Sequence, residues 1–241
     1  MPTAPTMPMA FRMGIEPTTA ARLHLLQLVS PALPVGAFSY SEGLEWLVQA
    51  GRIGDGPSLQ SWLTAELQHG ALSLEVAALA PLRQALECWQ RAGQADGLRA
   101  LRDLEGWLLA QRESPELRAQ QRQMGASLQQ LLADLGWPLP PPALAWPAAF
   151  AWACLCLEIG SPLSEEAYLY GWMANQISAA VRLVPLGPTE GQRLQLQLAP
   201  LLAERAEALA VADPHQLWSA GVGAGLAQLR HAELYSRLFR S

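Results

Sequence analysis

Lysine is absent from this chain of 241 residues, so all sixteen basic residues are arginines. A nucleotide-binding P-loop needs a lysine to contact the phosphates, and NTPase activity of that kind is therefore excluded. The formal net charge is −5, and no block of basic residues interrupts the acidic balance. Proteins that bind nucleic acid by neutralising its phosphates carry the opposite charge pattern. We expect no nucleic-acid partner.

Cysteine and histidine are scarce, with three and four residues. Cys154 and Cys156 are two positions apart, a spacing that points them to different sides of a helix and forms no metal clamp. Unpaired cysteines of this kind fit a reducing cytoplasm. The histidines have neither the paired spacing of a metal site nor the motif of an active site. We predict a cytoplasmic protein with no catalytic residue, no metal site and no cofactor.

Signals for β-strands are nearly absent, since no stretch keeps a period-two alternation and no hairpin dipeptide separates β-branched runs. Apolar residues recur at helical spacing instead, often after a capping residue. The sequence predicts an all-α fold, one globular domain of roughly eight to ten helices. The predicted helical segments are 20–29, 59–79, 82–89, 98–108, 115–135, 148–160, 164–184, 189–200 and one that begins at 214 and includes 222.

Prolines and glycines mark the expected boundaries. Pro81 should break or kink a helix, and Thr189 with Gln192 fits a capping box. The uncharged run 135–157 contains five prolines, which a membrane-spanning helix would not tolerate, and we predict no membrane segment. Its proline-rich part, 136–147, is expected to pack on the surface as an extended strap. Gly221, Gly223 and Gly225 resemble half of a nucleotide-binding fingerprint, but no strand precedes them, and close helix packing is the preferred interpretation.

Three regions follow from this pattern. Residues 1–19 are predicted to be a disordered start, because they contain several prolines and no apolar core like that of a signal peptide. Residues 20–229 form the helical domain. Residues 230–241 are predicted to be a mobile, partner-binding tail, in which an aromatic residue and leucines stand between arginines. A frayed helix end with solvated charges is the alternative for this tail.

The stretch from Ser30 to Trp46 places two prolines and two glycines among large apolar side chains. Its backbone must turn sharply while its apolar residues, Phe38 among them, still find cover. One interpretation is a packed loop between helices. The other is a docking surface, because Phe38 and Tyr40 lie among serines and glutamates, as aromatic anchors do within a polar rim.

Four collinear blocks carry a resemblance to a known family. The first is Ser-Pro-x-Leu-Pro-Val-Gly-x-Phe-Ser-Tyr-Ser-x-Gly-Leu-Glu, which begins at Ser30. The second joins Glu116-Leu117-Arg118 to Met124-Gly125-x-Ser127-Leu128, the third runs from Asn175 to Gly187, and the fourth is Leu234 to Ser241. Together they resemble the urease accessory protein UreF from about Leu23 to the last residue. Pro188 stands where the family pattern leads us to expect glutamine, which leaves the role of that loop open.

This resemblance implies a non-catalytic cytoplasmic factor for nickel-urease maturation. Proteins of the family are all-α, form dimers, bind the accessory protein UreD (also called UreH) and recruit the GTPase UreG, which delivers nickel to apo-urease. Residues of the opening loop together with Arg182 would serve the UreG side and the assembly surface, and tail residues would engage the partner complex. The implied partner-binding residues are Pro34, Gly36, Phe38, Ser39, Tyr40, Glu45, Arg182, Tyr235, Arg237, Leu238, Phe239 and Arg240.

Other interpretations remain open for some of these residues. Arg182 lies near the end of its predicted helix, where a cation is favourable for local reasons. Alternatively, Arg182 or Arg237 supplies an arginine to UreG in trans, so that the chain acts as a GTPase-activating protein. Direct carriage of nickel is a third interpretation, and the small number of histidines argues against it.

Overall fold

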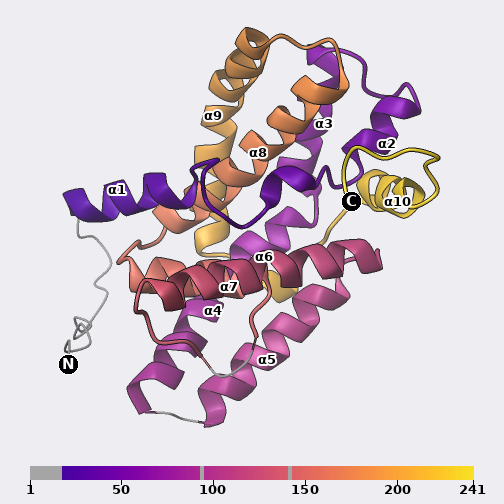
Figure 1. Ribbon diagram of the computed structural model, residues 1–241. Helices are drawn as coiled ribbons and strands as arrows, with labels where there is room; N and C mark the ends of the chain where they lie inside the picture. The colour runs from indigo at the N-terminus through magenta and orange to yellow at the C-terminus, as the bar shows by residue number, and fades with distance from the viewer. Residues whose placement is uncertain (1–17, 93–94, 141–142) are drawn as a thin grey trace.

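The computed structural model describes residues 18–92, 95–140 and 143–241, and within these ranges the chain forms α-helices and short 3-10 helices but no strand (Figure 1). The predicted all-α single domain is confirmed. The predicted disordered start lies outside the described residues except for Thr18 and Thr19, which cap and begin the first helix. The elements are α1 (Thr19–Leu28), η1 (Ala37–Ser39), α2 (Leu44–Gln49), α3 (Gly56–His69), α4 (Leu72–Ala92), α5 (Ala95–Ala110), α6 (Pro115–Asp134), α7 (Trp146–Cys156), α8 (Leu163–Leu183), α9 (Pro188–Ala210), η2 (Pro214–Gln216) and α10 (Val222–His231).

The centre of the fold is α7, which is apolar on every side because other elements cover every side. Phe150, Trp152 and Cys154 on this helix are at most 2% exposed. Both α4 and α6 pack along it, and α4 also contacts α5, α8 and α9. Helices α3, α8 and α9 form one end of the molecule, and α4 and α5 form the other (Figure 1). The chain's last residue lies beside α2 and α10 (Figure 1).

Several predicted helix boundaries were wrong, each for a local reason. The segment predicted to be one helix over 59–79 is divided into α3 and α4 at Gly70, where a Cβ atom would lie 2.6 Å from the carbonyl oxygen of Glu66. Pro81 lies inside α4, and the helix continues through it. Thr189 is not a cap, because α9 begins at Pro188 after Gly187 and continues through Pro200.

The segment after Asp213 also differs from the prediction. The expected helix that includes Val222 is a single 3-10 turn, η2, followed by a non-helical link. That link is held to the end of α3, because the backbone N–H of Ala220 donates to the carbonyl oxygen of His69 over 2.8 Å. The next helix, α10, begins only at Val222 and packs against α2. The chain's last helix is thereby placed beside the opening loop.

The proline-rich segment 136–147 lies on the surface over part of its length, as predicted, but its last residues are buried. Leu144 and Ala145 are at most 5% exposed, and the N–H of Leu144 donates to Oε1 of Gln129 on α6. The carbonyl oxygen of Leu144 lies so close to Gly125 that a Cβ atom there would be 2.1 Å away. This glycine therefore allows the strap to reach the helix.

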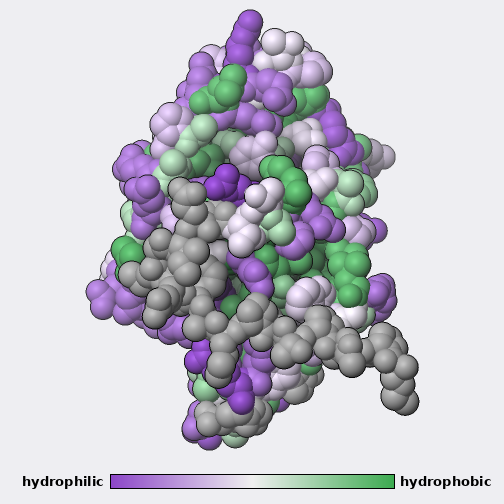
Figure 2. Space-filling model, turned by 90° about the vertical axis from the view of Figure 1, so that its left-hand side faces the viewer, coloured by the Kyte–Doolittle hydropathy of each residue, from purple (hydrophilic) through white to green (hydrophobic). Residues whose placement is uncertain are grey.

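No helix within the described residues is both long enough and apolar enough to cross a membrane. On the face that carries α1, hydrophobic residues form small patches among hydrophilic ones (Figure 2). Several large apolar side chains between the start of α10 and the end of the chain are also exposed. They are Val222, Leu226, Leu229, Tyr235 and Leu238.

Candidate partner-binding surface

The opening loop turns at two glycines with left-handed backbone, Gly36 (φ 73°) and Gly43 (φ 86°). These turns bury Tyr40 at 6% exposure and leave Phe38 at 67%. The expectation that Phe38 would be buried was wrong. Its predicted role as an aromatic anchor, by contrast, requires an exposed ring. Tyr40, also predicted to be an anchor, lies in the core instead. Pro34 is exposed, and Ser39 is half-buried.

Gly43 brings the loop against α10. A Cβ atom at this position would lie 2.9 Å from the backbone nitrogen of Gln228 and 3.0 Å from Cβ of Ala227. Any other residue would push the two segments apart, in addition to the cost of its positive φ. The Gly-Leu-Glu part of the loop motif therefore has a packing function: it joins the first and last parts of the chain.

The last residues of the chain are bound to the opening loop and do not form a free tail. The carbonyl oxygen of Ser241 accepts three hydrogen bonds, from N and Oγ of Ser41 at 2.7 Å each and from N of Glu42 at 3.1 Å. The N–H of Arg240 donates to the carbonyl oxygen of Ser39 over 2.8 Å. The prediction of a mobile tail is corrected on this point, because backbone hydrogen bonds hold its end to the domain.

Glu45 on α2 is the second anchor of the tail. Its side chain is buried, and its two carboxylate oxygens accept from the N–H groups of Leu238 (2.6 Å) and Phe239 (3.1 Å). Oε2 also lies 2.9 Å from Nε2 of His231. A buried carboxylate needs such donors, and here two of the three come from the tail backbone. Glu45 was predicted to contact a partner, but in this structure its carboxylate is occupied within the chain.

Arg182, near the end of α8, is exposed and connects the opening loop to the tail. Its Nη1 donates to the carbonyl oxygen of Phe38 over 3.2 Å, and its guanidinium lies 4.5 Å from the centroid of the Phe239 ring. This cation–π contact and hydrogen bond join the loop to the tail. About two turns earlier on the same helix, the side-chain amide of Asn175 donates to the carbonyl oxygen of Tyr40 over 3.2 Å. The amide of Asn175 thus helps to fix the loop.

Glu42 was predicted only as one of the polar-rim glutamates around Phe38 and Tyr40, and the structure shows that it also fixes the loop. It has a positive φ of 52°, unusual for a residue other than glycine, and such strain persists only where the surroundings hold it. Gln120 on α6 and Trp172 on α8 donate to its two carboxylate oxygens over 2.7 and 3.0 Å. Gln228 on α10 donates to its carbonyl oxygen over 3.3 Å. The only sequence signal was a glutamate between two residues of the loop motif.

These contacts bring nearly all the predicted partner-binding residues into one region, although they come from positions 34–45, 182 and 235–240. Phe38, Tyr235 and Leu238 are exposed at 67%, 105% and 55%, while Phe239 is buried. Arg237 and Arg240 are exposed. We call the exposed residues Phe38, Tyr235, Arg237, Leu238 and Arg240 the loop–tail surface.

A second set of exposed side chains, which the sequence analysis missed, extends this region along α10. Val222, Leu226 and Leu229 are 69%, 55% and 45% exposed. Their spacing of four and three residues, visible in the sequence, places them on one face of the helix. Aromatic and apolar residues beside arginines are the composition of protein interfaces.

The described residues of this region form no recognisable catalytic or metal-binding arrangement. His231 has no serine or cysteine among its hydrogen-bond partners, and its Nε2 faces a carboxylate that holds the tail. Among the described residues, no group of three or more histidine, cysteine, aspartate or glutamate side chains could hold a metal ion. Cys154 and Cys156 are buried, and burial raises the pKa of both thiols, to about 12 for Cys156, which leaves them protonated and inert.

Comparison with known proteins agrees with the motifs. The family model UreF matches residues 53–199. A urease accessory protein UreF from Alkalilimnicola ehrlichii is 39% identical, over 92% of this chain and 96% of its own length. Proteins of the same name from Synechocystis sp. and Nostoc sp. are 40% and 42% identical, over 92% and 91% of this chain and 98% and 95% of theirs. The chain therefore belongs to the UreF family of urease accessory proteins.

Proposed function

We propose that this chain is a non-catalytic maturation factor of nickel urease that works in the cytoplasm. It binds UreD (UreH), recruits the GTPase UreG and so allows nickel to be inserted into apo-urease. Family membership and the names of the relatives support the link to urease. The single structural observation that carries the proposal is the loop–tail surface, where side chains suited to docking are exposed on a backbone fixed by hydrogen bonds.

The fixed backbone matters for affinity. Ordering a flexible tail on binding costs free energy, and that cost falls when the tail is already held in place. Residues 238–241 are held by Glu45, Ser39 and Ser41, so Tyr235 and Leu238 project from a defined position. We therefore assign the tail and Phe38 to one continuous partner contact. In this proposal the functional unit is a homodimer.

Arg182 and Arg237, the two candidates for acting on UreG in trans, differ in their contacts within the chain. Arg182 makes contacts within the chain, to Phe38 and Phe239, and these account for its position without a partner. Arg237 is exposed. If the chain also stimulates GTP hydrolysis by UreG, Arg237 is the residue to supply the charge, because an arginine that acts in trans must be able to reach the nucleotide.

Co-purification with the cognate UreD and UreG tests the proposal. We expect the full chain to form a complex with them and to restore nickel-dependent urease activity in cells that lack it. A chain without residues 233–241 keeps α10 complete, and we expect it to remain helical by circular dichroism but to lose both properties. Absence of complex and of urease activity with the full chain would overturn the assignment of these partners.

A further inference from the structure

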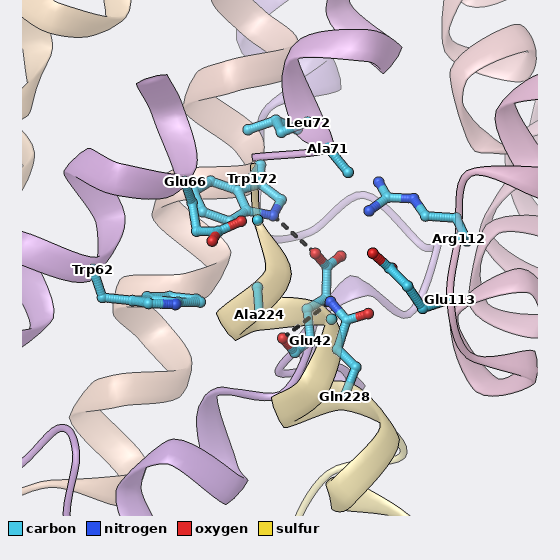
Figure 3. A pocket seen from close by; sticks show the side chains of 12 residues that line it. Glu42, Trp62, Glu66, Ala71, Leu72, Arg112, Glu113, Trp172, Ala224 and Gln228 are labelled. Carbon is cyan, nitrogen blue, oxygen red and sulfur yellow. Dashed lines mark hydrogen bonds between the residues drawn. The ribbon is translucent and has the colours of Figure 1, made fainter. Parts of the chain in front are cut away.

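A small pocket lies beside Glu42 of the opening loop, where α3, α8, α10, the start of α4 and the link between α5 and α6 approach one another (Figure 3). Its volume is about 20 Å³, which suits a group of the size of a water molecule. The indole rings of Trp62 and Trp172 form part of its wall, with their centroids 6.0 Å apart. The opposite wall includes Gly225, against which the carboxylate of Glu113 is packed.

The pocket is rich in hydrogen-bond acceptors that carry negative charge. Three carboxylates line it, those of Glu42, Glu66 and Glu113, and the ends of Glu42 and Glu113 are turned toward each other (Figure 3). Arg112, the one cation among the lining residues, forms a buried ion pair with Glu75 and directs its Nε and Nη2 there. Its hydrogen bonds therefore go to a fourth carboxylate, although its charge also acts on Glu42 and Glu66 in the pocket.

A buried amide supplies an independent sign of a missing partner. Gln228 is only 8% exposed and donates through Nε2 to Glu42, yet its Oε1 has no hydrogen-bond partner. Buried polar atoms of this kind are almost always paired, so an unpaired acceptor in a pocket indicates that a donor binds there.

We propose that this pocket binds a primary ammonium group, either the ammonium ion itself or the tip of a lysine side chain from a partner protein. An ammonium group is close to water in size and offers only donors, which matches carboxylates and an unpaired amide oxygen. Its charge offsets the repulsion among the glutamates. Burial and the neighbouring Glu42 raise the pKa of Glu66 to about 7 against the opposing effect of Arg112, and a cation in the pocket would lower this pKa again.

A directly coordinated metal ion does not fit this site as well. None of the described side chains form a group of three metal ligands, here or elsewhere. The pocket also has an indole wall in place of further oxygen ligands, which Mg²⁺ and Ca²⁺ require. Indole rings instead attract ammonium groups through their π-electron faces.

The fluorescence of the purified full chain tests the proposal, because Trp62 and Trp172 line the pocket. We titrate ammonium chloride, methylammonium chloride and tetramethylammonium chloride at constant ionic strength against sodium chloride. We expect a saturable change with the first two cations and none with the third, which is too large and has no N–H donor. A lysine-containing tripeptide and its norleucine counterpart form a second arm. A response to the lysine peptide but not to the norleucine peptide would show that the pocket accepts a partner's lysine side chain as well as the free ion.

Two variants and a control make the test specific. Glu113 is exposed, so Glu113→Gln should fold and should weaken ammonium binding about tenfold, the usual effect of losing a charge-assisted hydrogen bond. Gln228→Met should weaken it about fivefold, and Glu204→Gln, an exposed site on α9, should leave it unchanged. Equal binding by wild type and Glu113→Gln, no saturable response, or tighter binding of Ni²⁺ or Mg²⁺ than of ammonium would overturn the proposal. None of these outcomes depends on UreD or UreG.

Discussion

The carboxylate of Glu45 is predicted to hold the C-terminal tail on the domain. In the variant Glu45→Ala, the N–H groups of Leu238 and Phe239 and Nε2 of His231 lose their acceptor. Each hydrogen bond to a charged group is worth about 1.5–3 kcal/mol, so the full loss would exceed about 4 kcal/mol if the tail stayed in place. The tail can instead detach and bind water. The loss is then limited to the free energy of docking the tail, which we put at about 3 kcal/mol from these bonds and the buried Phe239 ring.

Two measurements check this magnitude. For a chain of this length, about 3 kcal/mol corresponds to a fall in Tm of about 6–12 °C. Amide hydrogen exchange of the peptide covering 232–241 should become about 100-fold faster, and the slowest amides of α7, which exchange through global unfolding, should accelerate by no more than the same factor. Glu204→Ala, on the exposed side of α9, is the matched control and should change neither value. Unchanged protection of the tail in Glu45→Ala would refute the reasoning, since another contact would then hold residues 238 and 239.

Three further predictions follow from buried or crowded positions. Gly125→Ala should lower the free energy of unfolding by about 2–4 kcal/mol in urea denaturation, because its Cβ would lie 2.1 Å from the strap, whereas Gly106→Ala, with nothing within 4 Å, should be neutral or stabilising. Burial raises the pKa of Glu105 from 4.5 to about 7 despite its hydrogen bond from Ala145, so the unfolded chain loses this proton first and stability falls as pH rises between those values. Glu105→Gln should remove about 3 kcal/mol of that fall, measured as the difference in unfolding free energy between pH 4.5 and pH 8. An unchanged pH dependence in this variant would contradict the prediction. Arg182→Gln should expose Phe239, seen as faster exchange of the tail, while Arg193→Gln, whose ion pair is on the surface, should not affect it.

The helices could be predicted because local signals determine them. In α6, for example, Ser114 is the cap and Pro115 is the first helical residue, as a serine followed by a proline before apolar residues at helical spacing indicates. The errors came from positions where a tertiary contact overrides the local rule. Gly70 ends α3 in the middle of a continuous apolar pattern, and Pro81 is accommodated inside α4, which neighbouring helices enclose.

Residues for a candidate site could be named from the sequence, but their arrangement in space could not. Family motifs singled out Phe38, Arg182 and the tail, yet no pattern in the sequence indicates that Ser241 would hydrogen-bond to Ser41, 200 positions away. Nor does any pattern indicate that the carboxylate of Glu45 would accept hydrogen bonds from the tail backbone. Whether a residue in a motif faces a partner or faces its own chain depends on long-range packing, and local patterns in one sequence do not reveal that packing.

The contribution of the loop–tail surface to partner binding is the most direct test of the proposed function. Phe38→Ala combined with Tyr235→Ala removes two exposed rings without disturbing the hydrogen bonds of the tail backbone. The control, Leu196→Ala combined with Val211→Ala, removes two side chains that are 76% and 88% exposed away from this surface. We predict that the first variant binds the UreD–UreG pair at least about 30-fold more weakly than wild type, as expected for aromatic anchors, with an unchanged Tm. Equal affinities for wild type and both variants would contradict the assignment of this surface.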